Sequence, residues 1–252
     1  MKNILESMII TFSMYSKIPM PNIDWKKENM KYAMCFFPLV GLVIGIIMAA
    51  WMYLAKFLAI GSILFAGIAT IIPVIITGGI HIVGFCDTVD ARSSHQSREK
   101  KLEILKDPHI GAFALIYCVV YFIAVFSFWT EVNITIDNII FIALVFMLSR
   151  AFSAFAIVTF KCSKNSGLAY MFSNAAERQV VKKCMFVYIG IIFVIMLFIN
   201  RLLAIGTIIL TMLCFVKYKK MSYNEFEGIT GDLAGYFLQM LEFILLIAVV
   251  IF

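Results

Sequence analysis

The residues best suited to chemistry lie in one short segment, Thr77-Gly-Gly-Ile-His-Ile-Val-Gly-Phe-Cys-Asp-Thr-Val-Asp-Ala-Arg92. If the part after Gly79 is helical, positions 83, 87 and 90 share one face of the helix. Asp87 and Asp90 then project together at the boundary of the preceding apolar run. Paired carboxylates suit Mg²⁺, which prefers hard oxygen ligands, keeps several waters and shares its shell with phosphate. The segment therefore predicts a metal-assisted site.

The simpler interpretation is that these two aspartates only end a membrane helix in water, and their spacing alone favours it. Gly78, Gly79 and Gly84 weaken that preference, because glycine permits tight turns and close approach of the backbone to a ligand or cofactor. His81 weakens it too, although a lone histidine is more often a hydrogen-bonded structural residue than a ligand. These neighbours make a site plausible without excluding the simpler interpretation.

A second acidic segment, Glu225–Gly235, enters the last apolar run of the chain. It contains three glycines and places Asp232 at the start of that run. We expect Asp232 to lie at the same membrane depth as Asp87 and Asp90. Carboxylates from two segments at one depth favour a metal site more than either segment does alone.

Two basic residues outside the acidic segments could also take part in the site. Ser97 predicts the start of a short helix over Arg98–Lys106, which the following Asp-Pro pair ends. Lys106 then lies just before the next apolar run and can face the site. Arg150 lies within an apolar run, where a charge is costly and usually faces a polar interior. Contact with an anionic group and a structural ion pair are equally consistent with its position.

The composition shows what must position these side chains. The 252 residues are 63% hydrophobic and only 14% charged, whereas soluble domains are near half apolar and a quarter charged. Lipid must therefore be the solvent for most of the chain. The loops between apolar runs are too short for a separate soluble domain. We predict an all-α, polytopic transmembrane helical bundle in which residues 1–252 form a single integral membrane domain.

Apolar runs long enough to cross roughly 30 Å of hydrocarbon predict about seven spans. The fifth and sixth are short and separated by only two residues, so they form either a tight helical hairpin or one poorly resolved pair. The expected spans are Ala33–Leu58, Ala59–Ile80, Ile110–Trp129, Asn138–Phe160, Cys184–Ile199, Leu202–Val216 and Tyr236–Phe252.

The basic residues predict the orientation of the bundle. Eighteen of the 21 lysine and arginine residues fall before the first span or in the loops at 81–109, 161–183 and 217–235. The loop at 130–137 has acidic residues and no basic one. Because basic loops stay in the cytoplasm, we expect a cytoplasmic N-terminus and an acidic site on the cytoplasmic face. The net charge of +6 is thereby explained by topology, and we expect no nucleic-acid partner.

Separated blocks of the sequence, in order, resemble the cobalamin synthase family, the adenosylcobinamide-GDP ribazoletransferases. The resemblance spans almost the whole chain. The blocks are Lys17-Ile-Pro-Met-Pro21, Phe37-Pro-Leu-Val-Gly41, Gly45, Gly78-Gly-Ile-His81, Gly84, Asp87-Thr-Val-Asp90, Leu102-Glu-Ile-Leu-Lys-Asp107, Gly111, Ser149-Arg150, Gly167-Leu168 and Gly228-Ile-Thr-Gly-Asp232.

The resemblance implies a Mg²⁺-dependent transferase of the cell (inner) membrane. A hydroxyl of α-ribazole, or of its 5′-phosphate, attacks the phosphate that joins cobinamide to GMP. GMP leaves, and adenosylcobalamin or its 5′-phosphate forms. The resemblance leaves a homo-oligomer open. It assigns Asp87, Asp90 and Asp232 to Mg²⁺, directly or through water, His81 to the attacking hydroxyl, and Arg150 and Lys106 to phosphates.

One position departs from the family pattern. The family reads His-x-Asp-Gly-x-x-Asp-x-x-Asp, whereas this chain has Val83 in place of the first aspartate. The acidic face thus loses one of three carboxylates. We expect weaker metal binding and slower turnover. A site that tolerates two acids, an inactive paralogue and a substitution that traps one state are all consistent with this change.

Two other functions fit parts of the sequence. A non-catalytic corrinoid-binding membrane protein or a transporter would also have glycine-interrupted segments and an intramembrane arginine, but the sequence has no convincing internal repeat. The segment Asp87-Thr-Val-Asp-Ala-Arg92 resembles part of the metal motif of CDP-alcohol phosphotransferases. The downstream aspartate pair of that motif is missing, so this alternative ranks lower.

Overall fold

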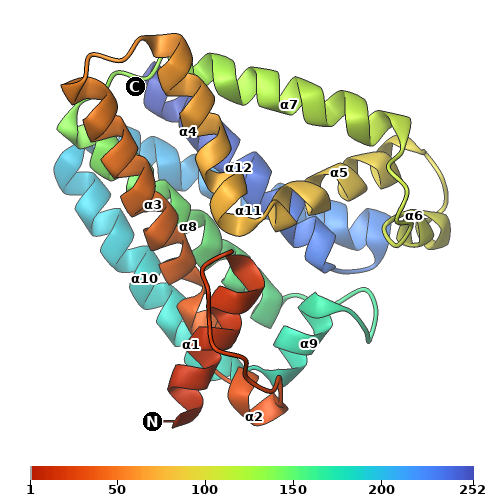
Figure 1. The fold of residues 1–252 in the computed structure, drawn as a ribbon. Coiled ribbons are helices and arrows are strands. Elements are labelled where there is room, and N and C mark those ends of the chain that lie inside the picture. Colours follow the sequence, from red (N-terminus) through yellow and green to blue (C-terminus); the bar gives the residue numbers. More distant parts are fainter. Residues whose placement is uncertain (1) are drawn as a thin grey trace.

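A computed structural model describes residues 2–252, and this range is almost entirely helical (Figure 1). It contains no strand beyond one isolated bridge within the described residues. The helices of this range are α1 (Lys2–Tyr15), α2 (Lys27–Met30), α3 (Ala33–Phe57), α4 (Ser62–Thr77), α5 (Ile80–Ser93), α6 (Arg98–Ile104), α7 (Ala112–Thr130), α8 (Ile136–Thr159), α9 (Leu168–Ala175), α10 (Arg178–Ile199), α11 (Arg201–Phe226) and α12 (Gly231–Ile251).

The prediction of an all-α, polytopic membrane protein is confirmed. Six helices, α3, α7, α8, α10, α11 and α12, are each long and apolar enough to cross a bilayer. A seventh crossing is counted only if α4 and α5 are taken as one span, and these two helices meet at an angle of 96°. The predicted second span, Ala59–Ile80, corresponds to α4, whose 16 residues are too few to be counted as a crossing without α5.

The fifth and sixth spans are two full helices, which resolves the alternative that the sequence left open. Asn200 ends α10 and caps α11 by accepting a hydrogen bond from the amide of Leu203. Helix α11 continues ten residues beyond Val216, its predicted end, to Phe226. Apolarity stops near Val216, but the lysines and methionine that follow are good helix formers. The loop before α12 is correspondingly shorter than predicted.

The centre of the bundle is the contact between α3 and α8, with α10 beside them (Figure 1). Helices α12 and α8 are joined by a buried ion pair, in which Nη1 of Arg150 donates to Oε1 of Glu242 at 2.6 Å. Helix α1 packs on α3, and the hydroxyl of Thr11 donates to the carbonyl of Ala33 at 2.7 Å. The N-terminal segment is thus part of the packed bundle.

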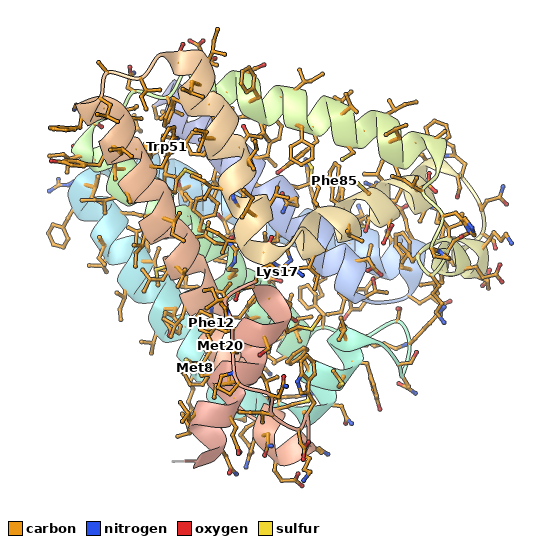
Figure 2. The ribbon with its side chains drawn as sticks, in the orientation of Figure 1. Met8, Phe12, Lys17, Met20, Trp51 and Phe85 are labelled. Carbon is orange, nitrogen blue, oxygen red and sulfur yellow. The ribbon has the colours of Figure 1, made fainter. Side chains whose placement is uncertain are left out.

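The bend between α4 and α5 is made by two glycines in the left-handed conformation. Gly78 and Gly79 have φ values of 66° and 78°, which side chains with a Cβ adopt at a cost. Lys17 holds this turn from outside: its amide donates to the carbonyl of Ile76 at 2.7 Å. Its side chain fills the space where a Cβ of Gly78 would lie, and Figure 2 shows Lys17 beside the turn.

Helix α5 is held on two sides and open on a third. On one side Gly84 lies so close to α12 that a Cβ there would be 2.8 Å from the carbonyl oxygen of Asp232. On another side Phe85, labelled in Figure 2, packs against α7. Its ring centroid lies 4.9 Å from that of Tyr121. The remaining face holds Val83 and Asp87, so the bend and these two contacts determine where the acidic face points.

The start of α12 is fixed by a short pairing of two loops. Cys162 and Ile229 form a parallel bridge. The amide of Ser163 donates to the carbonyl of Ile229 at 3.0 Å. The amide of Ile229 donates to the carbonyl of Lys161 at 2.9 Å. This pairing brings the loop before α9 next to Asp232.

Candidate active site

The two acidic segments that were predicted to share one site lie together. Asp87 is half-buried on α5, and Asp232 is the second residue of α12. Asp87 lies close enough to Asp232 and to Asp90 for the charges of both carboxylates to act on it. Val83 is on the same face of α5 and is 56% exposed. The close contact between Gly84 and the backbone of Asp232 produces this arrangement.

Asp90 differs from Asp87 in its surroundings. Its carboxylate lies against Gly111 and accepts a long hydrogen bond, 3.4 Å, from the amide of Ala114. These residues are at the start of α7, where a negative charge is stabilised by the exposed amides of the first turn. Asp90 therefore has a structural partner within the protein.

The described residues 2–252 contain no group of three His, Cys, Asp or Glu side chains close enough to hold a metal ion by themselves. Mg²⁺ does not require such a group, because one or two carboxylates can bind it together with water and substrate phosphates. Asp87 and Asp232 are the pair with this chemistry. Val83 occupies the position on α5 from which a further carboxylate would face the same space.

His81 is buried next to this pair, at the first turn of α5. It is 5% exposed, and its ring stacks on Tyr15 with centroids 5.9 Å apart. Its Nε2 atom has no hydrogen-bond partner. The ring lines a small cavity of about 70 Å³ that also contains Asp232 and Ser153. A buried imidazole nitrogen without a partner is unusual and is available to a bound molecule.

A second cavity, of about 230 Å³, adjoins the first and shares Asp232 and residues of α9 with it. Lys106 and Lys164 both line it. Partial burial, together with the nearby charge of Lys106, lowers the pKa of the Lys164 ammonium. The hydroxyl of Ser163 lines the same cavity and is buried without a partner. The N-termini of α9 and α12 also border this space, so the cavity suits an anion such as phosphate.

Arg150 does not line either of these cavities. It is 1% exposed, and besides Glu242 its Nη1 atom donates to the carbonyl of Phe146 at 2.9 Å. This is the structural ion pair that the sequence left as one alternative. A direct role of Arg150 toward a phosphate stays a prediction.

Gly78, Gly79 and Gly84 were predicted to lie close to a ligand. In the structure they lie against other parts of the protein instead. A Cβ at Gly84 would meet the backbone of α12, and a Cβ at Gly78 would meet the side chain of Lys17. Gly79 completes the turn. These contacts account for glycine at Gly78 and Gly84 without a cofactor.

Sequence reasoning did not identify Lys164 or Ser163 as site residues. Lys164 lies in a basic loop whose charge was explained by membrane topology, and Ser163 belongs to no motif. The only signal was that Lys164 lies three residues before Gly167-Leu168, one of the blocks described above.

Comparison with known proteins agrees with the resemblance seen in the sequence blocks. Residues 7–250 match the family described as Cobalamin-5-phosphate synthase. The adenosylcobinamide-GDP ribazoletransferase of Lachnoclostridium phytofermentans is 46% identical over 247 residues, which cover 98% of this chain and 94% of the relative. A protein of the same name from Clostridium perfringens is 32% identical over 256 residues, covering 99% of this chain and all of the relative. No solved structure matches the chain.

Proposed function

Because this chain belongs to the cobalamin-5-phosphate synthase family, we propose that it joins adenosylcobinamide-GDP to α-ribazole, or to α-ribazole 5′-phosphate, and releases GMP. The observation that supports this most is the meeting of three features at Asp232. These are the carboxylate of Asp87, the unpaired nitrogen of His81 and the cavity with two lysines. Phosphoryl transfer depends mainly on positioning and on charge stabilisation, and these features provide both.

Each residue of the site has a role that follows from its chemistry. Lys106 and Lys164 hold phosphate oxygens in the cavity that they line. The free Nε2 of His81 orients the attacking hydroxyl or accepts its proton. Tyr15 keeps the imidazole ring in place by stacking on it. Arg150 contributes by fixing α8 to α12 through Glu242.

Asp87 and Asp232 fit a Mg²⁺ ion of the kind that is shared with substrate phosphates. When bound there, Mg²⁺ supplies positive charge against the phosphate oxygens of the diphosphate. Asp90 would assist such an ion only through water, since its own carboxylate lies at the start of α7. With Val83 in place of an acid, the protein offers fewer anionic ligands than the family pattern. We therefore propose weak Mg²⁺ binding in the absence of substrate.

We place the site on the cytoplasmic face of the cell membrane. The segments that border it, at 94–111 and 160–167, contain six lysine and arginine residues, namely Arg98, Lys100, Lys101, Lys106, Lys161 and Lys164. The loop at the opposite end, between α7 and α8, contains none. This asymmetry supports a cytoplasmic site, where soluble nucleotides have access.

The proposed reaction is tested with purified chain in phosphatidylcholine vesicles, supplied with Mg²⁺, adenosylcobinamide-GDP and either form of ribazole. We expect GMP and a corrinoid that contains ribazole, identified by mass spectrometry. Asp87→Asn should lower the rate by about 100-fold or more. Asp137→Asn, which removes a carboxylate at the far end of α8, should leave it unchanged.

The same assay separates the alternative function. Binding of adenosylcobinamide-GDP without GMP release, under every condition and with Val83→Asp as well, would contradict the proposed reaction. It would favour a non-catalytic corrinoid-binding protein or a transporter.

A further inference from the structure

A larger cavity, of about 420 Å³, lies between α11 and α12. It is separate from the acidic site. Arg92, which lines it, follows Asp90 by two residues and therefore points about 200° away around α5. Arg92 is also tied to the same side as the cavity, because its guanidinium donates to the hydroxyl of Tyr236 at 3.2 Å. The proposed reaction makes no use of this cavity.

The cavity changes from apolar to basic along the two helices. Cys214, Met240 and Ile244 line one end. Lys217 and Lys220, one and two turns further along α11, line the other end with Arg92. This order matches a molecule with a hydrocarbon part and an anionic part.

The basic end of the cavity has positive charges that no ion pair neutralises. Lys217 and Lys220 are three residues apart and share one face of α11. Neither forms an ion pair with any described residue. The acid in the lining, Glu225, is already held by Arg92 at 3.1 Å and by Lys101 at 2.8 Å. The wall of the cavity therefore attracts an anion.

The length of α11 places this end at the membrane surface. The helix has 26 residues and is about 39 Å long, whereas the hydrocarbon layer is about 30 Å thick. If Arg201 marks one surface, the last two turns extend into the other headgroup region. Lys217 and Lys220 then lie about 24 Å and about 29 Å from that surface, just inside the hydrocarbon boundary, from which a lysine side chain extends to the lipid phosphates. Met240 and Ile244 lie at the depth of the acyl chains.

We propose that this cavity binds an anionic phospholipid. Its phosphate lies at Lys217 and Lys220, and an acyl chain packs against Met240, Ile244 and Cys214. Tyr236, in the same lining, is one helical turn from Asp232. A bound lipid thus contacts the helix that positions the acidic site, without contacting substrate.

The test compares phosphatidylglycerol with phosphatidylcholine as added probes for the purified full chain, using native mass spectrometry in a neutral detergent. We expect preferential retention of phosphatidylglycerol. Lys217→Gln/Lys220→Gln should lose roughly 10- to 30-fold in apparent affinity for it, the effect of two lysines at a lipid surface. The matched control is Lys183→Gln/Lys219→Gln, which removes the same charge. Lys219 points elsewhere, 5.3 Å from the ring centroid of Phe160.

Equal losses in the two double variants would overturn the proposal, because the preference would then reflect surface charge in general. Equal retention of both lipids by the wild-type chain would also overturn it. So would displacement of phosphatidylglycerol by inorganic diphosphate, because the cavity would then be a site for a soluble anion.

A second measurement uses the thiol at the apolar end. Alkylation of Cys214, read by peptide mass spectrometry against Cys118 in the same molecule, should slow in phosphatidylglycerol but not in phosphatidylcholine. The slowing should persist in Lys183→Gln/Lys219→Gln and disappear in Lys217→Gln/Lys220→Gln. Slowing that is independent of Lys217 and Lys220 would contradict the proposed position of the lipid.

Discussion

Residue 83 lies on the face of α5 that also holds Asp87, and its side chain is 56% exposed. An exposed position has room for a carboxylate, so packing does not require valine here. The apolar side chain removes one negative charge from the space between α5 and Asp232. Its main consequence is therefore electrostatic.

Val83→Asp should increase the rate of GMP release at low Mg²⁺ and shift the Mg²⁺ dependence to lower concentration, by roughly 10-fold for one added ligand. The physical reason is the added anionic oxygen beside Asp87. The measurement is GMP release at a series of Mg²⁺ concentrations. Val83→Asn, which adds polarity without charge, is the control. Equal rates and equal Mg²⁺ dependence for valine and aspartate would contradict this expectation.

Arg150 and Glu242 should be coupled in stability. Glu242→Gln leaves the buried guanidinium without its carboxylate and should cost about 3–5 kcal/mol. Arg150→Met/Glu242→Met, which removes both charges, should recover much of that loss. The measurement is unfolding in phosphatidylcholine bicelles. If Glu242→Gln leaves stability unchanged but abolishes GMP release, Arg150 acts on the substrate and not on the bundle.

At the scale of elements, the position of the site depends on how closely α5 approaches α12. The contact is made by Gly84 on α5 and Gly235 on α12. A Cβ at Gly235 would lie 2.9 Å from the carbonyl oxygen of His81. The bend at Gly78 and Gly79 turns α5 toward this contact. Side chains larger than hydrogen would separate Asp87 from Asp232.

Gly84→Ala should therefore destabilise the protein by about 1–3 kcal/mol, the usual cost of overpacking, and lower the rate of GMP release. Unfolding and activity are measured on the same preparation. Gly190→Ala is the control, because a Cβ there meets no atom within 4 Å. Full activity and stability in Gly84→Ala would show that α12 shifts without consequence, which would contradict a site shared by the two helices.

At the scale of the whole molecule, the predicted orientation can be tested by labelling. In a background without the six native cysteines, Asn133→Cys lies between α7 and α8, and Asn165→Cys lies beside the candidate site. A membrane-impermeant maleimide should label Asn133→Cys in intact cells and Asn165→Cys only after the membrane is opened. The reverse pattern would place the site outside and would contradict the positive-inside prediction.

The sequence by itself determined the all-α class and six of the predicted crossings. Apolar runs of sufficient length must become helices in lipid, because only a helix satisfies its own backbone hydrogen bonds there. The sequence also determined that Asp87 shares a face of α5 with position 83, since that depends only on local helical spacing. The ends of α11 and the bend after α4 were less predictable, because helices continue past apolar runs and glycine pairs permit several turns.

Only the tertiary structure decided which distant residues meet. Glu242 is 92 residues from Arg150 in the sequence, and Lys164 comes beside Lys106 through the pairing of Cys162 with Ile229. Asp90 proved to have a partner at the start of α7, which its spacing from Asp87 does not reveal. Helical periodicity encodes contacts within one helix. Contacts between helices depend on glycine faces and loop pairings whose individual signals in the sequence are weak, so the acidic motif could be read locally while its surroundings could not.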